Sequence, residues 1–171
     1  MNTIELLMAE HISLRLRFRM MREDQNWNSI YQVEEFVRSC HAKVEDEIVF
    51  PILKKKMELV EKGQVVTNVL IRLEADHKLI DKIGEQIRLR TVEGDSELLG
   101  KRIALYCSTV ETHNTAEETQ IFSHWRNDFE GIDTRERVMK IMKEFGLSRY
   151  YEITGTSEEL IRLFEKREMK E

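Results

Sequence analysis

The sequence predicts an all-α protein: an antiparallel, up-and-down four-helix bundle followed by a short helical C-terminal extension. Its 171 residues include only 7 Gly and 1 Pro, which is few turn formers for a many-stranded sheet. Four long stretches space their apolar residues by three and four, as one face of a helix does. Short polar breaks separate these stretches, and short connections favour antiparallel neighbours.

The first half of the chain contains two of the expected helices. One covers residues 3–22, with Thr3 as its candidate N-cap. The next runs from about residue 29 to residue 61, and Gly63 is expected to end it. Pro51 lies inside this second helix and predicts a kink or the loss of one backbone hydrogen bond.

The second half repeats this arrangement and then continues beyond it. Helices are expected over 65–90 and 97–127, joined by a turn near 93–96. Further on, the pattern predicts a short helix from Thr134 to Phe145, an irregular segment from Gly146 to Gly155, and a last helix from Thr156 to Lys170.

We therefore divide the chain into a bundle, residues 1–129, and a C-terminal extension, residues 130–171. The extension carries four apolar side chains that need a partner surface: Leu160, Ile161, Leu163 and Phe164. That surface is either the bundle of the same chain or another subunit. A homo-oligomer formed through the extension is thus one expectation.

Composition argues against several classes of protein. The chain has 27 basic and 32 acidic residues, a formal charge of −5, and no dense Lys/Arg stripe, so it is a poor nucleic-acid binder. Its apolar runs are far shorter than the ~20 residues that span a bilayer, and no secretory segment follows the N-terminus. Cys40 and Cys107 resemble neither a disulfide framework nor a CxxC zinc site. We expect a cytoplasmic protein that binds neither nucleic acid nor membrane.

Each half carries a histidine and a glutamate one helical turn apart on its apolar face. The pattern recurs after 72 residues, and each pair follows a helix with another histidine on its own apolar face, these two being 66 residues apart. Packing the two helical hairpins about a pseudo-two-fold axis would bring all of these side chains to the bundle centre. They are His11, His41 and Glu45 in the first half, and His77, His113 and Glu117 in the second.

Six polar side chains on buried faces are costly unless something compensates them. Core histidines paired with buried carboxylates would each contribute little net stability, whereas metal ions compensate all six at once. One tetrahedral zinc has too few coordination positions for four imidazoles and two carboxylates. Shared between two ions, they give each ion two histidines and both glutamates as bridges, with room for an oxo or hydroxo bridge and an exogenous ligand. Imidazole and carboxylate without thiolate favour iron or manganese.

These motifs resemble the hemerythrin-like, or HHE, cation-binding domain, whose pattern is His … His-x3-Glu … His … His-x3-Glu in a four-helix bundle. The acidic-then-Phe-Pro segment 45–51 also matches the family, and the likeness covers about residues 3–127. Leu73 and Asp81 stand where a further third-helix histidine would be sought, one turn either side of His77. The resemblance implies two iron ions, oxo- or hydroxo-bridged, with manganese or zinc as alternatives. The implied ligands are His11, His41, Glu45, His77, His113 and Glu117.

Three functional readings follow. The first is a non-haem di-iron protein that binds, senses or reduces a small diatomic molecule or peroxide (O2, NO or H2O2), as in oxidative or nitrosative stress. The second is an iron storage, donation or sensing module without redox turnover, and the third a purely structural bundle. No catalytic residue is assigned, and whether the protein is an enzyme stays open.

Several other polar residues lie near the predicted centre. Tyr106 is expected in the core, and His124 is expected to pack in the core or an interface, or to line the cavity mouth, without binding the metal pair. Four carboxylates flank the ligands one position off the apolar faces and are expected mainly in solvent or paired with surface Lys and Arg, with hydrogen bonds to ligand histidines as the second reading. They are Glu10, Asp46, Asp76 and Glu118.

Overall fold

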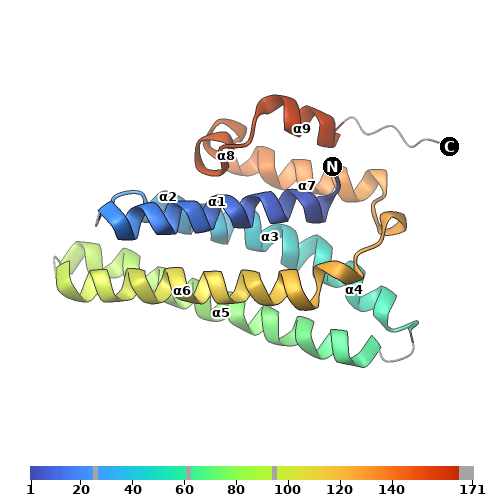
Figure 1. Ribbon diagram of the computed structural model, residues 1–171, viewed down its shortest axis with the longest axis horizontal. Helices are drawn as coiled ribbons and strands as arrows, with labels where there is room; N and C mark the ends of the chain where they lie inside the picture. Colours follow the sequence, from blue (N-terminus) through green and yellow to red (C-terminus); the bar gives the residue numbers. More distant parts are fainter. Residues whose placement is uncertain (25–26, 61–62, 94–95, 166–171) are drawn as a thin grey trace.

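The computed structural model describes residues 1–24, 27–60, 63–93 and 96–165. All regular secondary structure in these ranges is helical (Figure 1), which confirms the all-α prediction. Within the same ranges, no helix combines the length and the apolar character needed to cross a bilayer.

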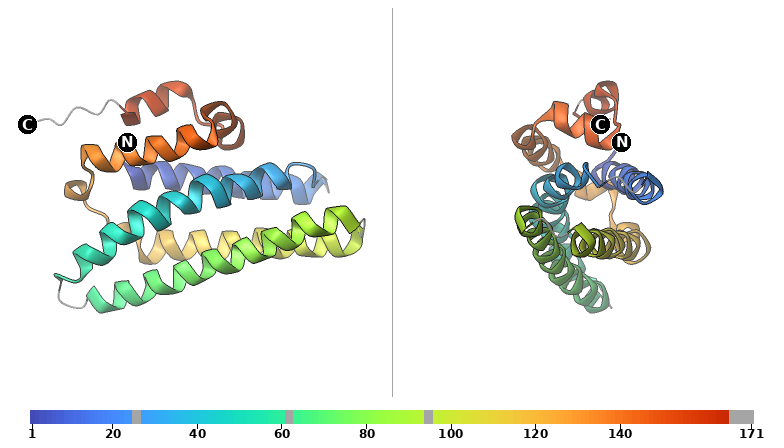
Figure 2. Two further views of the ribbon diagram at one scale, coloured as in Figure 1. Left: turned by 180° about the vertical axis from the view of Figure 1, so that it is seen from behind. Right: turned by 90° about the vertical axis from the view of Figure 1, so that its left-hand side faces the viewer.

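Four long helical segments lie side by side, and successive segments run in opposite directions (Figures 1 and 2). The second segment is interrupted by two π-helical turns, labelled η1 and η2, so it comprises five elements. The segments are α1 (Thr3–Asp24); α2 (Ile30–Phe36), η1 (Val37–His41), α3 (Ala42–Val44), η2 (Glu45–Val49) and α4 (Phe50–Met57); α5 (Gly63–Glu93); and α6 (Ser96–Gln120).

The C-terminal extension forms α7 (Ile132–Phe145), α8 (Leu147–Thr154) and α9 (Glu158–Glu165). These helices cover the side of the molecule formed by α1 and the second segment, away from α5 and α6 (Figure 2). Phe36 of α2 makes edge contacts with Phe145 and Tyr150, at ring-centroid distances of 5.7 and 5.8 Å. The buried face of the extension therefore packs against the bundle of its own chain.

The start of α1 differs from the prediction. Asn2, and not Thr3, is the N-cap: its side chain accepts a hydrogen bond from the backbone N–H of Glu5 at 2.9 Å, and the Glu5 carboxylate accepts one from the Asn2 N–H at 2.7 Å. The Thr3 hydroxyl instead donates to Glu130 at 2.7 Å. Thr3 thus ties the start of α1 to the segment after the bundle.

The predicted role of Gly63 is also wrong. The second segment ends at Met57, and Gly63 begins α5. A Cβ at Gly63 would lie 1.9 Å from the Met57 carbonyl oxygen, so this close approach of two backbones requires glycine. The predicted end near residue 61 lies outside the described residues.

Two further boundaries are corrected near the end of the bundle and beyond it. The fourth helix ends at Gln120 and not near residue 127, and two short 3-10 turns, η3 (Phe122–His124) and η4 (Asn127–Phe129), follow it. The segment from Gly146 to Gly155, predicted to be irregular, contains the helix α8. Its two glycines have φ of 105° and 66° and flank the helix, so they delimit a helix and do not disrupt one.

Pro51 is the second residue of α4, the helix that directly follows the π turn η2. Proline has no N–H to donate into the preceding turn. The guanidinium of Arg137, from α7, donates to the backbone carbonyl of Glu47 in that turn. The extension thus supplies a donor to an irregular stretch of the second segment.

Candidate metal centre

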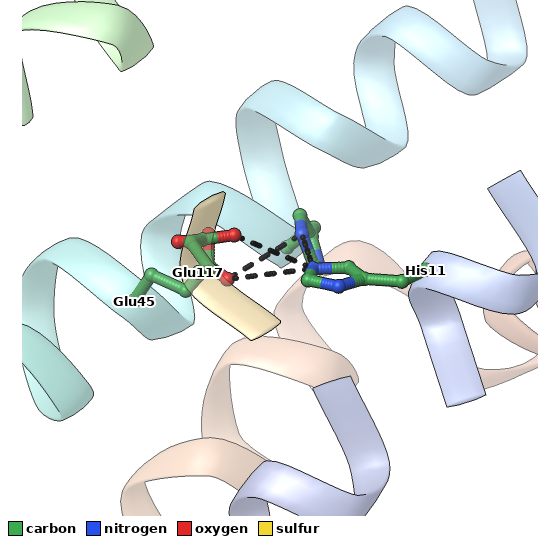
Figure 3. A group of neighbouring side chains, drawn as sticks. His11, Glu45 and Glu117 are labelled. Atoms are coloured by element: carbon green, nitrogen blue, oxygen red, sulfur yellow. Dashed lines mark hydrogen bonds and ion pairs between the residues drawn. The ribbon is translucent and has the colours of Figure 1, made fainter. Parts of the chain in front are cut away.

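The six predicted ligands meet in the middle of the molecule. His11 comes from α1, His41 and Glu45 come from the two π turns, and the remaining three come from α5 and α6. All six are buried: His11, His41, Glu45, His77, His113 and Glu117. Figure 3 shows the His11 ring directed toward the carboxylates of Glu45 and Glu117.

The donor atoms form two overlapping groups. One contains His11 and His41 with both glutamates, the other His77 and His113 with both glutamates, and the donors of each group lie within 4.8 Å of one another. We name the first group site A and the second site B. Glu45 and Glu117 belong to both groups, so both carboxylates would be shared if each group held an ion.

The Nε2 atom of each histidine faces this shared centre. In site A, Nε2 of His11 lies 3.1 Å from Nε2 of His41 and 3.5 Å from Oε2 of Glu117. In site B, Nε2 of His77 lies 3.2 Å from Oε2 of Glu45, and Nε2 of His113 lies 3.3 Å from Oε1 of Glu117. Imidazole nitrogens and carboxylate oxygens thus converge from four helical segments.

Both ligands of the second segment lie in π turns, at the end of η1 and the start of η2. A π turn contains more residues per hydrogen-bonded ring than an α turn, and such turns often occur at functional sites. The backbone N–H of Ala42 bonds to the carbonyl of Val37, and that of Phe50 to the carbonyl of Glu45, five residues back in each case. The local widening changes the direction in which the side chains after it project.

A carboxylate faces the Nδ1 atom of every one of these histidines. Three contacts have hydrogen-bond length: His11 to Glu118 at 2.9 Å, His41 to Glu10 at 2.6 Å, and His77 to Asp46 at 2.8 Å. The fourth, from His113 to Asp76, is longer, at 3.7 Å. A proton held on Nδ1 leaves the Nε2 lone pair free for a metal and raises ligand basicity. The structure therefore supports a hydrogen bond to a candidate ligand histidine for Glu118, Glu10 and Asp46, whereas Asp76 is partly exposed and makes no such bond.

The buried charges interact strongly. Burial lowers the pKa of His11, but the carboxylates of Glu118 and Glu45 outweigh it and raise that pKa to about 9. Burial also opposes the charge on His77, yet Asp46 and Glu45 raise its pKa to about 10. Burial raises the pKa of Glu117, and the adjacent charge of Glu45 raises it further. Without cations, protons on His11 and His77 offset part of this negative charge.

The centre fits a pair of metal ions. Among the described residues, both carboxylate oxygens of Glu45 and Glu117, and Nε2 of His77 and His113, are buried without a hydrogen-bond partner. Such atoms are costly in a protein interior. Two cations would satisfy these atoms together, and nitrogen and oxygen donors suit iron or manganese.

Comparison with protein families also indicates cation binding. Residues 2–142 match the family model of the hemerythrin HHE cation-binding domain. The chain belongs to this family. Searches of curated proteins and of solved structures gave no significant match. The family match continues beyond the predicted bundle boundary at residue 129 and covers most of α7.

The HHE repeat also extends to aromatic residues that the sequence analysis left without a role. Phe50 stacks on His77 with ring centroids 5.5 Å apart, and Phe122 stacks on His11 at the same distance of 5.5 Å. Each phenylalanine follows its His-x3-Glu pair by five residues and packs against the histidine of the other half. These rings fix the histidine planes and exclude water from that side.

Tyr150 of α8 is the site residue that sequence analysis missed most completely. Its hydroxyl donates to Oε1 of Glu10 at 2.6 Å, and the other oxygen of Glu10 accepts from Nδ1 of His41. Tyr150 is fully buried. The extension therefore reaches the HHE centre through two successive hydrogen bonds.

His124 lies in η3, is partly exposed and belongs to neither donor group. This placement agrees with the prediction that it is not a ligand. His124 lies beyond the end of α6 at Gln120. Tyr106 is buried, as expected.

Proposed function

We propose that this HHE protein is a non-haem di-iron protein, with an up-and-down four-helix bundle, that binds, senses or reduces O2, NO or peroxide. One observation carries the proposal: two buried donor groups share Glu45 and Glu117 and have the same composition, two histidines and two glutamates. A single ion would leave half of the histidines unused. Four protein donors for each ion leave coordination positions for an exogenous ligand.

The absence of thiolate from both donor groups favours iron over softer metals. Cys40 and Cys107 are free, buried thiols. Burial raises the pKa of Cys107 to about 12 and that of Cys40 still higher, so neither ionises readily. An iron pair would supply reversible one-electron chemistry, and the protein would supply the rest: oriented imidazoles, shared carboxylates and a dry surrounding.

The residues around the ligands are suited to hold a preorganised centre. Glu10, Asp46 and Glu118 fix histidine tautomers, and Phe50 and Phe122 fix ring planes. Rigid support of this kind suits a centre that keeps its ions through repeated ligand binding. It is less suited to an iron store, where ions must come and go.

The test is optical spectroscopy of the iron-loaded protein. The proposal predicts ferric absorption bands that change on addition of O2 to the reduced form, or of NO or H2O2. The alternative, iron storage or donation, predicts iron that a chelator removes readily and spectra that do not respond to these molecules. A folded protein that takes up no iron would contradict both.

The proposed partners are these small molecules, in the cytoplasm, with neither nucleic acid nor membrane. Association of copies through the extension is also proposed, and it would use the outer surface, where Ile132 and Leu163 are exposed. Light scattering of wild type and of Leu163→Ser tests it: a dimer that the substitution dissociates supports this contact, and a monomeric wild type contradicts it.

A further inference from the structure

Sites A and B differ in their access to solvent. A cavity of about 230 Å³ opens beside site B, and His77 and its partner Asp46 form part of its wall. Ala42, Lys78, Asp81 and Tyr106 also line it. It is large enough for several water molecules, each of which takes about 30 Å³ in the liquid. A diatomic molecule or peroxide therefore fits easily.

The repeat gives a reason why the carboxylate behind His11 at site A is better covered than the one behind His77 at site B. Adding 66 residues to Arg15 gives Asp81, and subtracting 72 from Glu118 gives Asp46. At site A the Arg15 guanidinium forms two contacts of 2.9 Å with Glu118, the carboxylate that holds His11. At site B the two equivalent residues are both acidic. Like charges do not form such a bridge, so nothing equivalent covers His77.

The exposed fractions of the four carboxylate side chains show the same difference between the two sites. At site B the side chains of Asp46 and Asp76 are 43% and 36% exposed. At site A those of Glu118 and Glu10 are 23% and 2% exposed. The extension contributes to this difference, because Tyr150 covers Glu10.

We propose that small molecules reach the metal pair through this cavity and bind on the His77–His113 side, while site A stays closed and serves to hold its ion. The inference rests on the proposed function and adds the route and the side of binding. The wall carries both signs of charge, so it attracts neither anions nor cations strongly. Its charged residues are Glu34, Asp46 and Asp81 on the acidic side and Arg38 and Lys78 on the basic side. The ligand class is a small, uncharged molecule such as NO, O2 or H2O2.

The test uses substitutions that fill the cavity and leave the six candidate metal ligands unchanged. Asp81→Arg places a guanidinium where it can pair with Asp46, as Arg15 pairs with Glu118, and Ala42→Leu fills the cavity from the opposite wall. Glu85→Arg is the matched control, since Glu85 is an exposed acid one turn further along α5 and is not among the lining residues. Each protein is loaded with ferrous iron, its iron content measured, and NO binding followed by stopped-flow absorbance.

The inference predicts that Asp81→Arg and Ala42→Leu keep their iron but bind NO roughly tenfold more slowly or worse, as expected for a blocked route that costs about 1.4 kcal/mol or more in the barrier. Glu85→Arg keeps the wild-type rate. Unchanged rates in both cavity variants would overturn the inference and leave the proposed function standing. A wild-type protein that holds iron and does not bind NO would overturn both.

A second measurement needs no metal. Hydroxyl radicals oxidise histidine rings that solvent can reach, and peptide mass mapping separates the histidines. In the iron-free protein, His77 should react well before His11, and Asp81→Arg should slow His77 specifically. Equal reaction of His77 and His11 would contradict the asymmetry.

Discussion

The two halves of the chain place their ligands alike and surround them differently. In both halves a histidine on one helix and a His-x3-Glu pair on the next point to one centre, and each His-x3-Glu pair is followed by a phenylalanine that stacks on the other half's histidine. At site A, Arg15 and Tyr150 cover the carboxylates behind His11 and His41. At site B the corresponding carboxylates are more exposed. The repeat thus fixes the positions of the candidate ligands, and residues outside the ligand set determine how well each site is covered.

The largest expected effect comes from the two residues that the halves share. Glu45→Ala or Glu117→Ala should reduce two bound ions per chain to at most one weakly held ion, since each carboxylate serves both sites and compensates both charges. Elemental analysis measures this. Glu111→Ala, on α6 beyond the centre, is the control and should keep both ions. Two ions with unchanged spectra in either shared-residue variant would refute the bridging roles.

Substitution of a single histidine should remove metal from one site and leave the other occupied. His41→Leu removes a donor from site A only and His113→Leu from site B only, so each should lose about one ion per chain. His124→Leu, outside both groups, should keep both. Iron content and thermal unfolding of the three variants check this. If His124→Leu lost metal as His113→Leu does, the assignment of the last helical segment would be wrong.

The carboxylates behind the histidines should matter unequally. Glu10→Gln weakens a buried contact of 2.6 Å, and Asp76→Asn weakens one of 3.7 Å that is partly exposed. Changing such a partner typically costs about 10- to 100-fold in metal affinity. We expect Glu10→Gln to fall in that range and Asp76→Asn below it, as measured by competition with a chelator. Equal losses would remove the distinction between the two sites.

A smaller effect is expected from the extension. Tyr150→Phe removes one hydrogen bond to Glu10, of about 1 kcal/mol, and should lower iron affinity about fivefold. Tyr151→Phe is the control, because the neighbouring ring lies on the partly exposed side of the same helix. Chelator competition and a shift of the ferric absorption bands report the effect. A Tyr150→Phe protein that is less stable but has unchanged iron affinity and spectra would show that the contact only supports packing.

The four long segments and the six candidate ligands could be predicted because each leaves a periodic mark in the sequence. Apolar spacing revealed the helix faces, and the repeat showed that His11 and His77, although far apart, occupy equivalent positions. The same comparison also placed Glu10, Asp76, Asp46 and Glu118 next to the candidate ligands, although their hydrogen bonds to the histidines were only the second expectation.

The remaining features depend on tertiary packing. The π turns around His41 and Glu45 keep the ordinary four-residue spacing, so nothing periodic distinguishes them. Gly146 and Gly155 indicate a break in the chain, but whether they interrupt or delimit a helix depends on the burial of Tyr150 between them. The bond from Tyr150 to Glu10 joins residues 140 positions apart. No local pattern predicts such a pairing.

The proposed dinuclear centre would hold two inequivalent ions. Protein purified without a His tag and loaded with iron-57 allows iron content and Mössbauer spectra to be measured on the same sample. We expect two iron ions per chain and two distinguishable ferrous signals in the reduced form. His113→Leu should remove one of these signals, and NO should alter that same signal first in the wild-type protein. A folded protein that binds a single iron ion per chain would contradict it.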